Sequence, residues 1–146
     1  MSRDVERTAI VAASPEEVWA YFADIPKWTE WDHDFGELVE NRGGLTENGG
    51  FVVTANVGLT LHVRFEEVEA HRRFVWPVSA LGGLFVVRGE FVLTPTDDGQ
   101  TELFYRFGPR SMITRLIDRL GRQQTIEGTE RGLANIVSHF EGAAAG

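Results

Sequence analysis

The first thirty residues change from a strand pattern to a helix pattern. Residues 5–13 are rich in β-branched side chains with partial alternation of apolar and polar positions, which predicts a strand. The segment Ser14–Glu17 then forms a capping-box motif with proline at the first helical position, and apolar residues follow at helical spacing. We expect a helix over residues 15–24, which Pro26 ends, and a second short helix around residues 28–31.

From residue 35 to residue 108 the apolar side chains occur in short runs separated by glycine-rich or Asp-Gly turn signals. Six strands are predicted, over residues 35–41, 51–57, 59–70, 73–80, 84–95 and 100–108. The connections are too short for parallel crossovers. Together with the first strand, they predict a seven-stranded antiparallel sheet.

The last third of the chain predicts a helix. Pro109 ends the last strand, and apolar side chains at a period of 3.6 residues predict a long helix over about residues 110–141. Glycines are expected to kink or loosen this helix near residues 121–128, and residues 142–146 are expected to fray. The element order indicates an α+β fold in a single domain over residues 1–146, with the long helix covering the apolar face of the sheet.

Several short motifs resemble the START-like (SRPBCC) superfamily, and more narrowly its polyketide cyclase/dehydrase and lipid-transport group. Residues Ala13–Trp19, Asp24–Trp28 and Glu30–Asp32 are similar to the opening of that family. Residues Phe91–Pro95, followed by Asp98–Thr101, resemble its last hairpin. The resemblance covers nearly the whole chain in order and spacing.

The resemblance implies a helix-grip fold. In such a fold a curved seven-stranded antiparallel sheet wraps a long C-terminal helix, two short helices follow the first strand, and a deep, mostly apolar cavity lies between sheet and helix. The superfamily includes lipid carriers, hormone receptors, cyclases and co-chaperones, so the fold alone does not identify the activity.

Alternation along each strand indicates which face is covered. One face carries charged side chains such as Arg73, Arg88, Glu90, Glu102 and Arg106, whose unpaired burial would each cost several kcal/mol. The charge-free face must therefore point inward. A bulge at Glu66-Glu67 would keep the inward phase beyond residue 65.

The inward positions form the predicted ligand-binding set, with two tryptophans near the mouth and three residues from the last helix. The set comprises Trp28, Trp31, Leu61, Val63, Phe65, Phe74, Trp76, Phe85, Val87, Phe91, Tyr105, Phe107, Met112, Leu116 and Leu120. Tyr105 is the one strand residue of this set with a hydroxyl group, and such a group needs a partner in a ligand or in water. Plain core packing explains many of the same positions.

The candidates for acid–base or metal chemistry are few. Asp32-His33-Asp34 has suitable side chains, but consecutive residues rarely converge on one ion, so we interpret the segment as a polar turn and expect no metal site. His62, Arg64 and Glu66 alternate on one strand face and form either an acid–base set in the cavity or, as we favour, part of the solvated outer face.

Polar residues for the interior are also scarce. The inward list offers Tyr105, with Glu127 or Glu130 from the helix as further possibilities. No nucleophile motif, phosphate loop or dinucleotide fingerprint is present, so no catalytic residue is assigned and no cofactor is expected.

Composition narrows the class of protein. The chain has 146 residues and a formal net charge of −8, with no cysteine, which excludes disulfides and thiolate metal sites. Acidity argues against nucleic-acid binding, and no apolar run is long enough for a signal peptide or a membrane span. We expect a soluble, cytoplasmic protein. Lys27 is the only lysine among many arginines, which suggests a GC-rich bacterial genome.

Arg115, Arg119 and Arg122 lie on one face of the predicted last helix, near Arg110. This basic patch is either a solvated face or a docking site for an acidic carrier protein or an anionic membrane surface.

For the whole chain we favour binding of a hydrophobic or aromatic small molecule, such as a lipid, isoprenoid or polyketide. The alternatives are a polyketide aromatase/cyclase or dehydratase, and a protein-interaction module with a vestigial pocket.

Overall fold

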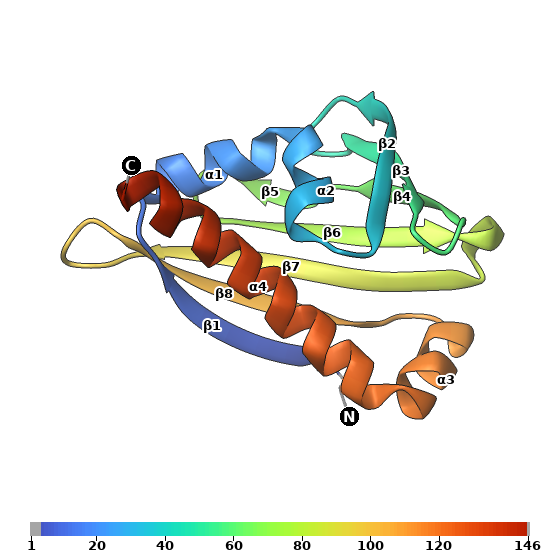
Figure 1. The fold of residues 1–146 in the computed structure, drawn as a ribbon. Helices are drawn as coiled ribbons and strands as arrows, with labels where there is room; N and C mark the ends of the chain where they lie inside the picture. The colour runs from blue at the N-terminus through green and yellow to red at the C-terminus, as the bar shows by residue number, and fades with distance from the viewer. Residues whose placement is uncertain (1–3, 146) are drawn as a thin grey trace.

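The computed structural model describes residues 4–145, with side chains described as far as Gly142. The first half contains β1 (Val5–Val11), α1 (Pro15–Ala23), the 3-10 turn η1 (Ile25–Lys27), α2 (Trp28–Trp31), β2 (Phe35–Arg42), β3 (Gly50–Ala55), β4 (Thr60–Arg64) and β5 (Glu66–Glu69). The second half contains β6 (Arg73–Ala80), the 3-10 turn η2 (Leu81–Gly83), β7 (Phe85–Pro95), β8 (Thr101–Pro109), α3 (Met112–Leu120) and α4 (Arg122–Ala145). Figure 1 shows their arrangement.

The strands form one antiparallel sheet in the order β1-β8-β7-β6-β4-β3-β2, and β5 pairs with β6 beside this path. The prediction of an antiparallel sheet is confirmed, and the predicted strand over residues 59–70 divides into β4 and β5. The division falls near the expected bulge, because Glu67 has a positive φ of 51° and the register shifts between Glu66 and Glu69. Phe65 is fully buried, and Val68 packs against the core.

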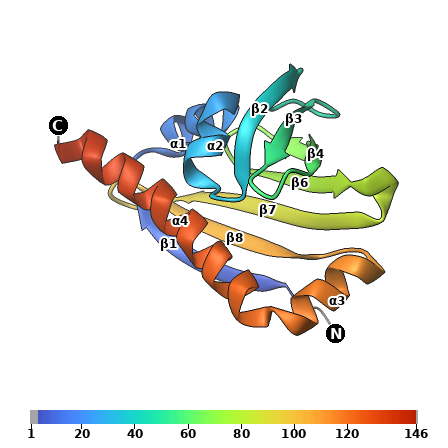
Figure 2. The same cartoon turned by 45° about the vertical axis from the view of Figure 1, so that its right-hand side comes forward.

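Helix α4 crosses one face of the sheet diagonally, with α1 and α2 beside its C-terminal half (Figures 1 and 2). It packs on β1 and β8, and Asn135 of α4 donates a hydrogen bond to the carbonyl of Trp31 in α2, 3.0 Å away. A sheet gripped around a long C-terminal helix, with short helices after the first strand, is the α+β helix-grip fold that the sequence predicted.

The C-terminal helix is not continuous, which corrects the expectation of one helix over residues 110–141. Gly121, with φ −127° and ψ 42°, ends α3, and α4 begins at the next residue. The break lies at the start of the region predicted to be loosened. Helix α4 continues through residues 142–145, where fraying was expected; Gly146 lies outside the described residues.

The charged face of the sheet points outward, and several of its charges are paired. Glu90, only 10% exposed at its side chain, accepts a hydrogen bond from Arg73 at 2.7 Å and lies 3.6 Å from Arg106. His62 and Arg64 are exposed on the same side, which confirms that they belong to the outer face. The choice of inward face by its lack of charge was therefore correct.

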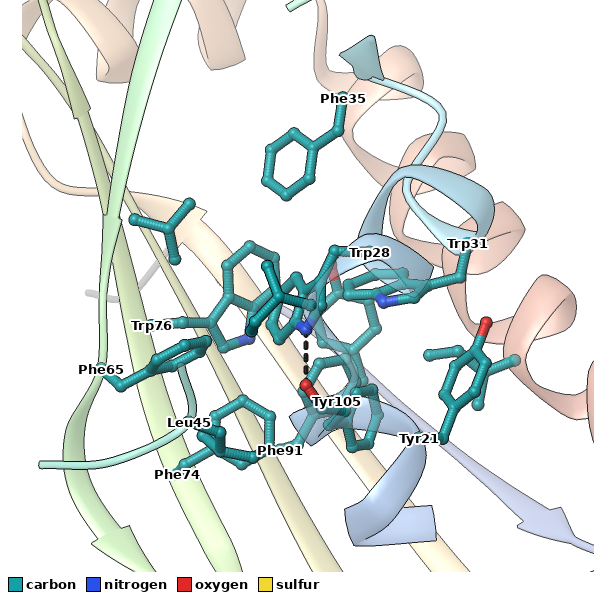
Figure 3. Packing of buried hydrophobic residues seen from close by; sticks show 14 of the residues in the cluster. Tyr21, Trp28, Trp31, Phe35, Leu45, Phe65, Phe74, Trp76, Phe91 and Tyr105 are labelled. Atoms are coloured by element: carbon teal, nitrogen blue, oxygen red, sulfur yellow. Dashed lines mark hydrogen bonds between the residues drawn. The ribbon is translucent and has the colours of Figure 1, made fainter. Parts of the chain in front are cut away.

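Aromatic rings fill the inner face beneath α1 and α2 (Figure 3). Trp28, Trp31 and Trp76 are all fully buried, and the Trp28 ring centroid lies 5.1 Å from that of Trp76. The indole of Trp28 donates to the carbonyl of Phe22 at 2.7 Å. Trp76 lies against the backbone of Gly89, where an added Cβ would be 2.1 Å from the indole. Glycine in β7 therefore makes room for the indole of Trp76.

The N-terminal cap of α1 gives a direct test of the sequence reasoning. The Ser14 hydroxyl accepts from the backbone amide of Glu17 at 3.2 Å, and the Glu17 carboxylate accepts from the Ser14 amide at 3.2 Å. Ser14→Ala should lower the free energy of unfolding by about 1 kcal/mol in a urea titration. Ser138→Ala, at an exposed position inside α4, is the matched control and should not destabilise. A loss below about 0.2 kcal/mol at Ser14 would contradict the cap.

Candidate functional site: a cavity between the sheet and α4

A cavity of about 450 Å³ lies between α4 and the inner face of the sheet. Its floor comes from β4, β6, β7 and β8, and its other walls come from the α2–β2 turn, the β3–β4 turn, α3 and the first half of α4. The aromatic cluster closes it on the side of α1 and α2, because Trp31 and Trp76 belong to both.

Part of the predicted ligand-binding set lies in the wall of this cavity. These residues are Trp31, Leu61, Trp76, Phe85, Val87, Tyr105 and Phe107. A second group is buried in the core without reaching the cavity wall, and consists of Trp28, Val63, Phe65, Phe74 and Phe91. Alternation identified the covered face correctly, but it could not separate residues under the aromatic cluster from residues under the cavity.

The three helix residues of the predicted set lie elsewhere. Met112, Leu116 and Leu120 are on the exposed side of α3, and none of them lines the cavity. The reason is that α3 is separated from α4 at Gly121 and presents Thr114 and Asp118 to the protein. The expectation that its apolar stripe covers the sheet is corrected.

Two glycines thin α4 where it passes over the cavity. Gly128 and Gly132 both line it. An added Cβ at Gly132 would lie 3.3 Å from the Trp31 ring, and one at Gly128 would lie 3.3 Å from His33. Because neither glycine has a side chain, α2 and the following turn approach the helix closely without filling the space between helix and sheet.

The cavity has a polar wall formed by Asp32, His33 and Asp34, the segment predicted to be a polar turn. The backbone amide of Asp34 donates to Asp32 Oδ1 at 3.0 Å, and Asn56 of the β3–β4 turn donates its side-chain amide to the His33 carbonyl. The three side chains bring possible ligand atoms within 4.8 Å of one another, although His33 and Asp34 are exposed. Consecutive residues do converge here.

Asp32 has an unusual electrostatic environment. Burial of its carboxyl group, with a smaller contribution from the nearby Asp34 charge, raises its pKa to about 7. Asp32 as a whole residue is half-buried, but its carboxyl group is enclosed. Asp32 forms part of the cavity wall. Near neutral pH this side chain can therefore both donate and accept a proton.

Tyr105 of β8 is the buried hydroxyl residue of the same cavity. Burial raises the pKa of its phenol well above the usual range, and the charges of Asp32 and Asp34 raise it further. Within residues 4–145 the hydroxyl has no hydrogen-bond partner. It remains a neutral donor and acceptor available to whatever enters the cavity.

The helical side of the cavity is also polar, and sequence reasoning missed it. Thr114 and Asp118 of α3 are buried and line the cavity with Thr125 and Thr129 of α4. Asp118 forms an ion pair with Arg122 at 3.0 Å. In the sequence, the signal for this polar side was the spacing of Thr114 and Asp118, and of Thr125 and Thr129, which are four residues apart and so share one face of a helix. Glu127 and Glu130, considered instead, are exposed, and Glu130 pairs with Arg7.

The sheet, the helix across it and the cavity between them define a START-like, helix-grip protein. The family model for "Polyketide cyclase / dehydrase and lipid transport" matches residues 2–141, so the chain belongs to that family. No protein of curated function matches the chain.

Solved structures show the same fold at low sequence identity. DynU16, from the dynemicin biosynthetic locus, superposes with a TM-score of 0.69 at 19% identity over 97% of this chain, which spans only 48% of DynU16. The protein jhp0584 of Helicobacter pylori gives a TM-score of 0.76 at 13% identity over 94% of this chain and 87% of its own. Ms6760 of Mycobacterium smegmatis gives a TM-score of 0.69 at 18% identity, over 97% of this chain and 93% of its own. Across residues 4–145, no helix is long and apolar enough to cross a membrane.

The raised pKa of Asp32 predicts a pH-dependent stability. The folded protein holds a proton on Asp32 up to about pH 7, whereas the unfolded chain releases it near the ordinary value of 3.8. The contribution of Asp32 to the free energy of unfolding therefore falls as pH rises between these values. Asp32→Asn keeps the acceptor for the Asp34 amide and removes the titration. Wild type should lose about 2 kcal/mol relative to this variant between pH 5 and pH 7.5 in urea titrations.

Asp97→Asn, in the exposed β7–β8 turn, is the control and should track wild type at both pH values. A constant difference between wild type and Asp32→Asn across this range would show that Asp32 titrates normally.

Proposed function

We propose that the protein binds a hydrophobic or aromatic small molecule in the cavity beneath α4. The observation that carries the proposal is the cavity itself, about 450 Å³ with Trp31, Trp76, Tyr105 and Phe107 in its walls. Ligand sites in proteins are concave, mostly apolar, and roughly 300–1,000 Å³ in volume, with a few polar groups that fix orientation. An open cavity of this kind supports ligand binding over the alternative of a vestigial pocket.

The polar groups limit the kind of ligand. Tyr105 and the protonated form of Asp32 offer hydrogen-bond donors inside the cavity, so a carbonyl or hydroxyl oxygen on an apolar body suits the site. Asp34 and Asp118 add carboxylates to the walls, which disfavours an anionic head group. A neutral lipid, isoprenoid or polyketide-like molecule has this combination of properties.

Filling the cavity from α4 tests this function. Gly128→Leu places a side chain into the space, and leucine favours the helix more than glycine does. Titration with Nile red, a neutral polarity-sensitive dye, should show one site in wild type with a change in tryptophan fluorescence. Binding to the variant should be about tenfold weaker or more.

Gly142→Leu, where an added Cβ meets nothing within 4 Å, is the control on the same helix and should bind the dye like wild type. Equal binding by the Gly128 variant, or no dye binding by wild type, would contradict the proposal.

A second candidate function is cofactor-independent cyclisation or dehydration of a polyketide-like substrate. The specific observation is that Asp32, with a pKa of about 7, shares the cavity with the neutral phenol of Tyr105. Asp32 as carboxylate could remove a proton from a carbon between two carbonyls, and as carboxylic acid return it to a departing hydroxyl, which leaves as water. Tyr105 could donate to the enolate oxygen.

A poly-β-ketone thioester tests this candidate. Turnover by wild type should fall about a hundredfold in both Asp32→Asn and Tyr105→Phe, while Nile red binding changes less than about twofold. Glu127→Gln, at an exposed residue of α4, is the control and should keep wild-type turnover. Full turnover in both cavity variants, or none in wild type, would contradict this second candidate, and ligand binding would remain the proposed function.

A further inference from the structure

We propose that the end of the protein around α3 docks on the surface of an anionic lipid bilayer, with α3 lying in the plane of the interface. The proposal begins with the inverted polarity of α3. Its buried residues are Thr114 and Asp118, whereas Met112 and Leu120 are 85% and 80% exposed. An amphipathic helix of a globular protein normally buries its apolar side. Here most of that side faces away from the protein.

Exposed apolar side chains are concentrated around the cavity. Among the residues that the structure describes, ten large apolar side chains are exposed, and eight of these lie in three segments. We call these eight the apolar rim: Val57, Leu81, Leu84, Met112, Ile113, Leu116, Ile117 and Leu120. The remaining two, Ile10 and Val39, lie in β1 and β2. Scattered apolar residues need no explanation, but a concentration of this kind marks an interaction surface.

The three segments lie beside the same cavity. Val57 of the β3–β4 turn, Phe85 after the β6–β7 connection and Ile117 of α3 all line the cavity. In Figures 1 and 2 the β6–β7 connection and α3 lie at the same end of the molecule. Surface insertion of the rim would therefore place the cavity against the acyl-chain region.

The charges around α3 match an anionic surface. Residues 109–125 carry four arginines and one aspartate, in a chain whose formal net charge is −8. Arg110 pairs with Asp4 and Arg122 with Asp118, so the attraction to an anionic surface rests on Arg115 and Arg119. Arg115 and Arg119 are exposed and follow Met112 around the helix on its polar side. In-plane membrane helices have this arrangement, with apolar side chains inserted and arginines reaching lipid phosphates at the border.

The shape of the rim favours a bilayer over a protein partner. The rim consists of side chains on three separate segments. Several of them, including Val57, Leu84 and Met112, are more than half exposed. A protein would need a complementary surface for each of these projections, whereas acyl chains adapt to any of them. A bilayer also stores apolar molecules, so docking would let one pass into the cavity without crossing water. Docking itself requires no ligand in the cavity.

Co-sedimentation with vesicles, without any dye or ligand, tests the proposal. Wild type should bind vesicles of phosphatidylcholine with phosphatidylglycerol, and bind pure phosphatidylcholine about tenfold more weakly. Leu116→Glu with Leu120→Glu should reduce binding to the anionic vesicles about tenfold or more. Arg115→Gln with Arg119→Gln should remove most of the preference for the anionic lipid.

The two exposed apolar residues outside the rim provide a matched control. Ile10→Glu with Val39→Glu makes the same chemical change on β1 and β2 and should bind vesicles like wild type. Nile red binding by each variant in the absence of vesicles shows that the fold and cavity are intact. A failure of dye binding in wild type would count against the proposed function, whereas a failure of vesicle binding alone counts against docking.

Three results would overturn the docking proposal. The first is no binding of wild type to anionic vesicles, including the case in which an acidic carrier protein binds α3 instead. The second is unchanged binding by the Leu116 and Leu120 variant, which would mean charge attraction alone. The third is that wild type is a dimer in light scattering and the Leu116 and Leu120 variant is a monomer, which would mean that a second copy covers the rim.

Discussion

One helix is too narrow to cover a sheet of eight strands, and the rest of the structure follows from that mismatch. The chain covers the remaining inner face in two different ways. Beneath α1 and α2, rings from several strands meet Trp28 at centroid distances between 5.1 and 6.1 Å, and that half is solid core. Beneath the first half of α4, glycines and threonines face the sheet, and the space stays open. The same fold therefore supplies stability at one end and a site at the other.

Much of the fold could be predicted from local chemistry. The face of each strand followed from where its charges could be solvated, as the Glu90 ion pairs on the outer face show. The start of α1 followed from Ser14 and Glu17, because a capping box needs only residues that are close in sequence. The resemblance to the START-like superfamily supplied what local chemistry could not, which was the cavity.

The site was less predictable because its residues depend on contacts between distant segments. Trp31 and Phe65 both occupy inward positions, but only the path of α4 decides that the first borders the cavity and the second does not. In the sequence, Asp32 looks like an ordinary turn residue. Its raised pKa arises from burial, which depends on segments far along the chain and so cannot be seen locally. For α3, periodicity identified the apolar stripe correctly, yet it could not show which side the stripe would face.

The orientation of α3 has a physical cause in its polar contacts. The Thr114 hydroxyl donates to the Val86 carbonyl at 2.7 Å, the Ser111 hydroxyl accepts from the Val86 amide at 3.2 Å, and Arg110 pairs with Asp4 at 2.7 Å. Hydrogen bonds to the start of β7 and an ion pair thus hold the helix in place, where most helices use apolar burial. Turning the stripe inward would break these contacts and carry Thr114 and Asp118 away from the protein. The polar anchoring of α3 is therefore what leaves its apolar residues exposed beside the cavity.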